Sequence, residues 1–265
     1  MGQDNIDVFF QIPEWLIVIL LLVAMAAVCD AGYRLGRRSR AEEKTKALVP
    51  TVAGSILALM GLLLGFTMSM SVTRYDARRR LVLEESNAIY TTYLRAQVLP
   101  APERTELQEL LRRYAEVRLR VSQSAVNPPE LRQGREEAAR LQNELWSRAT
   151  QLGQKEPQSV PAGLFLESLN NAFDLENARW ISFVAHVPPS VIYVNVFMGL
   201  VAVLIVGYGF GMTGHRHLLS EALLIVSIAA VIAVIIELDR PHSGIVRVSQ
   251  QPLVDLQRRL STPNH

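Results

Sequence analysis

Residues 49–99 read VPTVAGSILALMGLLLGFTMSMSVTRYDARRRLVLEESNAIYTTYLRAQVL, and this stretch decides the fold. It begins with an apolar run long enough to cross the ~30 Å hydrocarbon core of a bilayer. No proline and no glycine cluster follows that run, so the helical pattern continues to Pro100. At 1.5 Å per residue, a helix over 49–99 is on the order of 75 Å long. The stretch therefore predicts one helix, half in lipid and half in water, with Pro50 in its first turn.

The composition agrees with a membrane protein that carries a soluble part. Of 265 residues, 49% are hydrophobic and 20% are charged. The apolar residues gather in four blocks of spanning length, which are Trp15–Ala31, Val49–Val72, Val191–Phe210 and Leu218–Leu238. We therefore expect an all-α membrane protein with four transmembrane helices. A helical soluble bundle lies between the second and third of them, and the second helix extends out of the membrane.

This pattern divides the chain into four parts. Residues 1–72 hold the first two spans and a basic loop, 73–189 the soluble bundle, 190–239 the last two spans as a hairpin, and 240–265 a tail. Apolar residues at helical spacing predict soluble helices over Glu103–Ser124, Glu130–Gln151 and residues 162–185, with a short helix over 251–260 in the tail. The first block has no basic region before it, so it is interpreted as a permanent anchor.

Two faces of the second span differ in residue type. Small residues that allow close helix packing form one face, and they are Gly54, Ala58, Gly61 and Gly65. The opposite face passes from apolar to polar, through Ile56, Met60, Leu63, Thr67, Met70, Arg74 and Arg78. We expect the small face to meet a neighbouring helix. The second face is compatible with lipid, a partner helix or a pore, and its polar end favours a pore.

Polar residues near the membrane ends are expected to have a structural role. They are Asn170, Asp174 and Arg179 before the third span, and Glu237, Asp239 and Arg240 after the fourth. We expect them to pair or to cap backbone groups, because an unpaired charge at that depth is costly. Asn195 lies within the third span, where a polar residue bonds a neighbouring helix or serves transport.

Several function classes lack support in the sequence. Cys29 is the single cysteine, and the His215-Arg216-His217 loop has no third ligand nearby, so no metal site is predicted. No nucleophile, base and acid combination suggests catalysis, and no cofactor is expected. The net charge is +2 and no basic tail is present, so nucleic acid is not an expected partner.

Three segments resemble signatures of the bestrophin-like domain family, a group of mostly bacterial four-helix membrane proteins. These are LVLEESNAIYTTYLRAQVLP after the second span, LNNAFDLENAR before the third, and ELDRPHSGIVRVSQQPL after the fourth. The last is the most specific, because D-R-P-x-S-G directly after an apolar helix is rare. His242 stands there in place of an expected Phe. The resemblance covers nearly the whole chain.

The resemblance implies an architecture and a function. Bestrophins are pentameric anion channels whose second spanning helix lines the pore and then enters the soluble domain. Their acidic calcium clasp has no counterpart in this sequence, so calcium gating is not implied. The expected partners are further copies of this chain, the lipid bilayer and small anions.

Two functions therefore remain open. One is an oligomeric channel that passes small anions along the second helix. The other is a membrane-anchored sensing or interaction module without conduction. The expected location is the inner (plasma) membrane. Arg34, Arg37, Arg38, Arg40, Lys44 and Lys46 follow the first span, so the positive-inside rule puts the N-terminus and the soluble bundle outside. Arg74 and residues 78–80 favour the opposite orientation.

Overall fold

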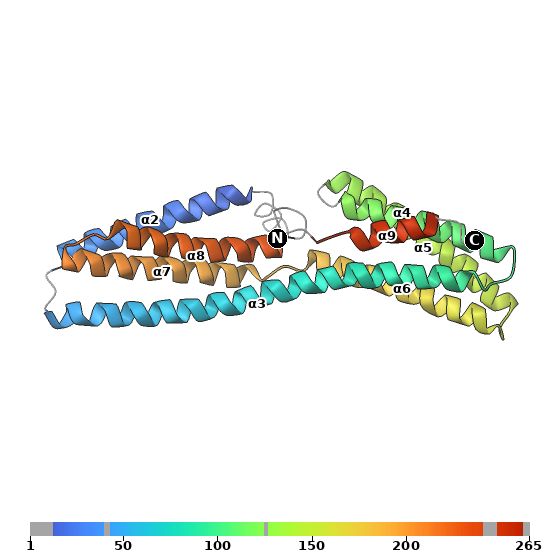
Figure 1. Cartoon of the computed structure of the whole chain (residues 1–265), viewed down its shortest axis with the longest axis horizontal. Helices are drawn as coiled ribbons and strands as arrows, with labels where there is room; N and C mark the ends of the chain where they lie inside the picture. Colours follow the sequence, from blue (N-terminus) through green and yellow to red (C-terminus); the bar gives the residue numbers. More distant parts are fainter. Residues whose placement is uncertain (1–12, 40–42, 125–126, 241–247, 262–265) are drawn as a thin grey trace. The chain divides into compact units, whose positions relative to one another are not determined.

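The chain is helical throughout the part that its computed structural model describes, which is residues 13–39, 43–124, 127–240 and 248–261, and no strand occurs there. The helices are α2 (Glu14–Arg38), α3 (Glu43–Ala96), α4 (Glu103–Gln123), α5 (Pro128–Lys155), α6 (Val160–Val184), α7 (Pro189–Thr213), α8 (Leu218–Asp239) and α9 (Gln251–Ser261). Figure 1 shows them along the chain. The predicted all-α fold class is confirmed.

The chain divides into two units. One contains the described residues up to Arg74 and those of His186–Arg240, and we call it the membrane unit. The other contains Tyr75–Ala185 and residues 248–261, and we call it the helical domain. Within the described residues, four helical segments are long and apolar enough to span a bilayer, which are Trp15–Arg38, Ala47–Ala96, Val160–Thr213 and Leu218–Asp239. The most apolar parts of these segments match the four predicted blocks.

The helix α3 is longer at its start and shorter at its end than the sequence predicted. It begins at Glu43, so Pro50 lies inside the helix rather than in its first turn. A proline there leaves the carbonyl four residues earlier without its helical N–H partner. At the other end, the amides of Gln97, Val98 and Leu99 each bond a carbonyl three residues back. These tighter bonds close the helix before Pro100.

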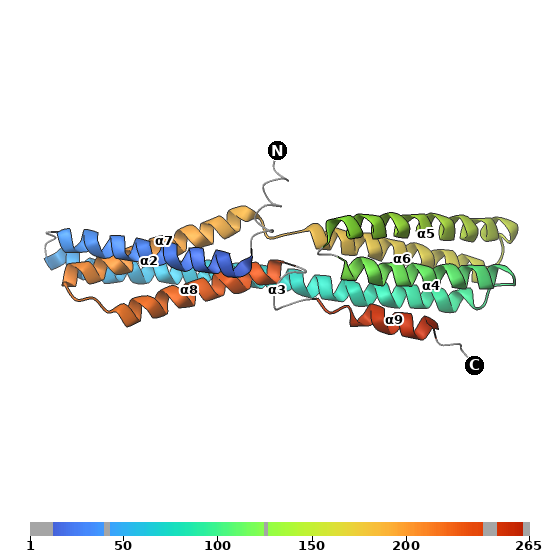
Figure 2. The same ribbon diagram turned by 90° about the horizontal axis from the view of Figure 1, so that it is seen from above.

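In the membrane unit, α2 and α7 pack very closely through glycine. A Cβ atom built on Gly32 would lie 2.2 Å from the Leu204 carbonyl oxygen, and one on Gly207 would lie 2.2 Å from that of Cys29. Gly36 and Gly211 are equally close to backbone of the facing helix. Figure 2 shows α2, α7 and α8 side by side. Two GxxxG pairs thus form the tightest helix contact of this unit.

The helical domain has its own apolar core. Its largest fully buried side chains include Tyr114 of α4, Leu145 of α5, Phe165 of α6 and Leu253 of α9. The apolar positions predicted for the soluble helices contribute to this core, including Leu107, Leu111, Val117, Val121, Ala138 and Leu141. The last helix, α9, packs beside α4 (Figure 1) and adds Leu253, Leu256 and Leu260 to the same cluster.

Candidate functional site

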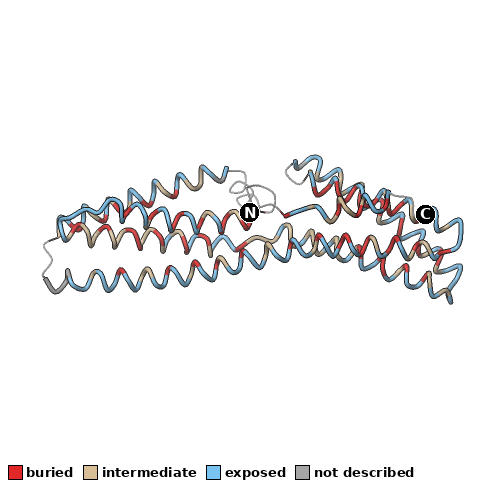
Figure 3. Tube along the Cα trace, viewed as in Figure 1, coloured by how far each residue is buried: buried red, intermediate tan, exposed pale blue. Residues whose placement is uncertain are grey.

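The spanning part of α3 presents one buried and one exposed side, and the colours of Figure 3 show buried positions recurring along it. The buried side includes Met60, which is 1% exposed, and Thr67, which is 3% exposed. Met60 belongs to the apolar core formed with α2, α7 and α8. Association with further copies can only bury a side chain more. Met60 and Thr67 therefore face the chain's own helices.

The small face of α3 is exposed in the single chain. A Cβ atom added to Gly54, Gly61 or Gly65 would have no other atom within 4 Å, and Ala58 between them is exposed. Large apolar side chains lie beside this face and are also exposed, and these are Val52, Leu59, Phe66 and Met70. Ile56 and Leu63, from the expected pore face, are half-buried. Every residue of the expected packing face is thus available to another molecule.

The two arginines expected at the end of the pore face have different surroundings. Arg74 is half-buried, and its Nε atom is buried without a hydrogen-bond acceptor among the described residues. Arg78 is 5% exposed and donates from Nε to the Ser182 carbonyl at 3.2 Å and from Nη2 to the Ala185 carbonyl at 3.0 Å. Arg78 therefore binds the C-terminal end of α6 inside the helical domain.

Asp239, at the end of α8, binds the residues that precede α7. It is 1% exposed, and its Oδ1 accepts a hydrogen bond from the Val187 amide at 2.9 Å. His186 places Nδ1 3.4 Å from Oδ2 of the same carboxylate. Arg240 beside it is buried, whereas Glu237 is half-buried. His242 and the rest of the family segment at 241–247 lie outside the described residues.

The three polar residues expected before the third span separate into two groups. Asn170 and Asp174 are exposed on α6 and bond each other, with 3.0 Å between Nδ2 and Oδ2. Arg179 instead reaches into the helical domain, where Nη1 pairs with Oε2 of Glu85 and Nη2 donates to Gln250 at 2.9 Å. Arg179 thus connects α6 to α3 and to the residue before α9.

Glu85 of α3 is the centre of a buried ionic network that sequence reasoning did not identify. Its carboxylate also accepts from Nε of Arg118 at 2.6 Å, and Arg118 donates from Nη1 to Glu176 at 2.9 Å. Burial alone would raise the pKa of Glu85, but the charges of Arg118 and Arg179 outweigh that effect and hold its pKa below the ordinary value. In the sequence, the one indication of this role was that Glu85 lies on the same face of the predicted helix as Arg78.

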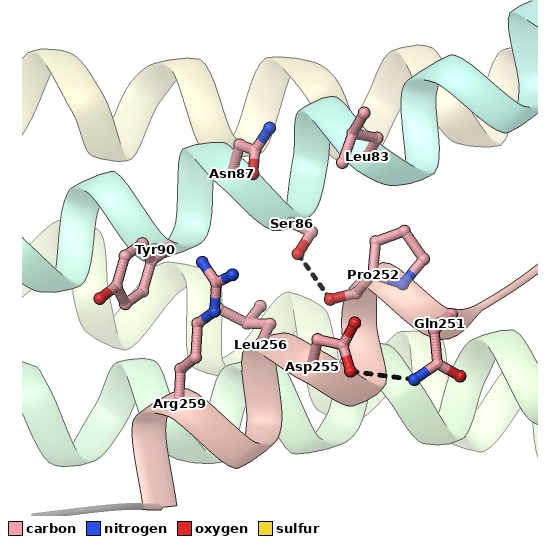
Figure 4. Close-up of a pocket in the computed structure, with 9 residues that line it drawn as sticks. All are labelled: Leu83, Ser86, Asn87, Tyr90, Gln251, Pro252, Asp255, Leu256 and Arg259. Atoms are coloured by element: carbon pink, nitrogen blue, oxygen red, sulfur yellow. Dashed lines mark hydrogen bonds between the residues drawn. The ribbon is translucent and has the colours of Figure 1, made fainter.

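A shallow pocket lies between α3 and α9 in the helical domain. Figure 4 shows Tyr90 and Asn87 of α3 on one side and Asp255 and Arg259 of α9 on the other. Ser86 Oγ donates to the Pro252 carbonyl at 2.8 Å across the base. The Arg259 guanidinium lies 5.4 Å from the centre of the Tyr90 ring. These contacts fix the tail helix on α3.

No group of three or more metal-ligating side chains gathers anywhere in the described part of the chain. Cys29 is buried and free. The features that do stand out are an exposed α3 face in the membrane unit and a charged network in the helical domain. Together with the four apolar segments, they define a multi-span helical membrane protein with an extramembrane helical domain.

Comparison with known families gives the class a name. The profile of the Bestrophin-like domain matches residues 19–253, so this chain belongs to the bestrophin-like domain family. No curated protein sequence matches it.

Solved structures show the same fold. A bacterial bestrophin homologue from Klebsiella pneumoniae is 16% identical, with a TM-score of 0.66 over 92% of this chain and 96% of that one. A single-residue variant of the Klebsiella homologue is 15% identical, with a TM-score of 0.67 over 92% and 96%. At these identities the likeness shows a shared fold.

Proposed function

We propose that the protein is an oligomeric channel for small anions in which α3 of each copy borders a central pore. The observation that carries the proposal is the exposed face of α3 in the membrane unit. Three glycines and Ala58 lie on it without an intramolecular partner. Exposed small residues allow a second helix to approach closely, and lipid gains nothing from them. The face therefore contacts a neighbouring copy, and family resemblance makes five copies the expected number.

The residues beside that contact border the pore. Phe66 and Met70 are exposed next to the small face, together with Val52 and Leu59. In a ring of copies these side chains form apolar constrictions, which gate by dewetting. Arg74, one turn beyond Met70, supplies the positive charge that concentrates anions. This arrangement keeps Met70 and Arg74 of the expected pore face. Val52, Leu59 and Phe66 border the pore in place of Met60 and Thr67.

Recordings from the purified protein in planar bilayers test the proposal. Phe66→Ala is expected to raise unitary conductance or open probability, because it widens an apolar constriction. Arg74→Gln is expected to shift the reversal potential towards cations. Met60→Ala is the control, since its side chain lies inside the chain and should leave unitary conductance unchanged. A pentamer that carries no current at any voltage or salt would favour the sensing module instead.

The orientation in the membrane is a separate part of the proposal. The basic residues at the end of α2, in the following loop and at the start of α3 support a cytoplasmic position for that loop by the positive-inside rule. The N-terminus and the helical domain are then outside. A fluorescent protein that matures only in the cytoplasm, fused after His265, should stay dark, and a bright fusion would reverse the assignment.

A further inference from the structure

A second pocket in the helical domain carries an unusual set of side chains. Its walls come from α4, α5 and α6. Val121, Leu131 and Phe183 supply apolar surface, and the polar groups that line it are Arg118, Ser122, Arg135, Glu176 and Arg179. The pocket is half-open, and its space of about 370 Å³ includes the solvent at its mouth, so a bound molecule lies partly in the pocket and partly in solvent.

The charges around this pocket do not balance. Arg118 and Arg179 are matched by Glu85 and Glu176 through the ionic network. Arg135 has no carboxylate partner among the described residues, and its guanidinium lies over the ring of Trp180. One positive charge is therefore in excess at a partly buried position.

The Arg135 guanidinium is held in place by an aromatic pair. Its central carbon lies 3.5 Å from the centre of the Trp180 ring, and that ring stacks on Phe183 at 5.3 Å with 23° between the planes. A cation above an indole face is favourable, and the stack fixes the plane of the guanidinium. The N–H edge of a fixed guanidinium fits the two oxygens of a carboxylate.

Two further arginines line the same pocket. Arg118 uses Nε and Nη1 for Glu85 and Glu176, and Arg179 uses both of its Nη atoms for Glu85 and Gln250. Nη2 of Arg118 and Nε of Arg179 have no acceptor among the described residues. Excess positive charge, unused N–H donors and apolar walls are the chemistry that recognises an organic anion.

We propose that this pocket binds a small monocarboxylate with an apolar body, with Arg135 as its main charged contact. The carboxylate accepts hydrogen bonds from Arg135, and the body packs on Val121, Leu131 and Phe183. The proposal goes beyond anion conduction because it assigns a ligand site to the helical domain, and it holds whether or not the protein forms a pore.

Quenching of Trp180 fluorescence by phenylacetate tests this site directly. The full-length protein in detergent carries Trp15→Phe and Trp146→Phe, so that Trp180 is the one remaining indole. Phenylacetate should quench it saturably. Phenylacetamide has the ring without the charge, and acetate has the charge without the ring. The affinity of each should be lower than that of phenylacetate by at least about tenfold. Equal quenching by phenylacetate and phenylacetamide would overturn the proposal without any site variant.

Variants of one helix then assign the charge. Arg135→Gln should weaken phenylacetate binding by about tenfold. Arg132→Gln is the matched control, because Arg132 is exposed on the same helix three residues earlier. Arg135→Lys keeps the charge but lacks the planar fork, so it should fall between them. If Arg135→Gln and Arg132→Gln bind phenylacetate equally well, Arg135 is not the anion contact and the proposal fails.

Discussion

Asn195 on α7 donates a hydrogen bond from Nδ2 to Oγ1 of Thr67 on α3, and the two atoms are 2.9 Å apart. Both side chains are 3% exposed. The second hydrogen of the amide reaches the Val191 carbonyl at 2.8 Å, and Thr67 in turn donates to the Leu63 carbonyl at 2.8 Å. The pair therefore joins α3 to α7 inside the membrane unit by side-chain hydrogen bonding.

A double-mutant cycle on this pair should reveal its coupling. Thr67→Val and Asn195→Leu each remove one partner, and the coupling free energy of unfolding is expected to be about 0.6 kcal/mol, with an upper bound near ~1.7 kcal/mol. Unfolding in mixed micelles with increasing sodium dodecyl sulfate measures it. Thr73→Val is the control, because Thr73 makes the same bond to a carbonyl four residues earlier but is exposed. Additive effects of Thr67→Val and Asn195→Leu would contradict the contact.

The Thr67 result shows where sequence reasoning on α3 reached its limit. Helical periodicity placed Gly61 and Gly65 on one face of α3 and Met60 and Thr67 on another. Periodicity alone does not say which face the chain uses for itself, because both a pore and a helix bundle accept apolar and hydroxyl groups. The partner of Thr67 is 128 residues away in sequence. Only the packing of α7 on α3 decides between the two faces.

The glycine contacts show a second limit of prediction from the sequence. The sequence predicted a close helix contact at Gly54, Ala58, Gly61 and Gly65, and that contact stays a prediction. Within the chain, Gly32, Gly36, Gly207 and Gly211 make the close contact. Both of these pairs have GxxxG spacing, so the signal was present in the sequence. The length of α3, the four apolar blocks and the soluble core were predictable because each depends on local pattern. The Glu85 network was not, because its members are far apart in sequence and lie on three helices, α3, α4 and α6.

Glycine substitutions should separate contacts within the chain from contacts between copies. Gly207→Ala is expected to destabilise the protomer by about 1–3 kcal/mol, because the new methyl group would overlap the Cys29 carbonyl. Gly61→Leu should leave the stability of the monomeric protomer nearly unchanged and shift the oligomer towards smaller species. Thermal unfolding and size-exclusion chromatography measure the two effects. An unchanged elution volume for Gly61→Leu would remove the small face from the subunit contact.

Arg118 and Arg120 lie within one turn of each other on α4, but their replacement by alanine should differ widely in its effect on the free energy of unfolding. Arg118 is 4% exposed in its pair with Glu85, whereas Arg120 is 61% exposed in its pair with Glu137. Arg118→Ala leaves a buried carboxylate with half of its partners, and the expected loss is about 3–5 kcal/mol. Arg120→Ala should cost about 0–1 kcal/mol. Chemical unfolding followed by circular dichroism tests both, and similar losses would mean that the Glu85 network contributes little.

The pH dependence of stability should report on Glu85. Arg118 and Arg179 lower its pKa in the folded state against the effect of burial. The contribution of Glu85 to the free energy of unfolding is therefore complete above the unfolded-state pKa of about 4.3, and it is lost as the pH falls through the lower folded-state pKa. Glu85→Gln lacks this group, so the stability difference between wild type and Glu85→Gln should be large at neutral pH. The difference should shrink as the pH falls below about 4.3.

Melting temperatures measured from pH 7 downward test this expectation. Glu84→Gln, at the exposed neighbouring residue, is the control, and its stability difference from wild type should stay small throughout. A Glu85→Gln difference that does not change with pH would show that the carboxylate charge is not what stabilises the network.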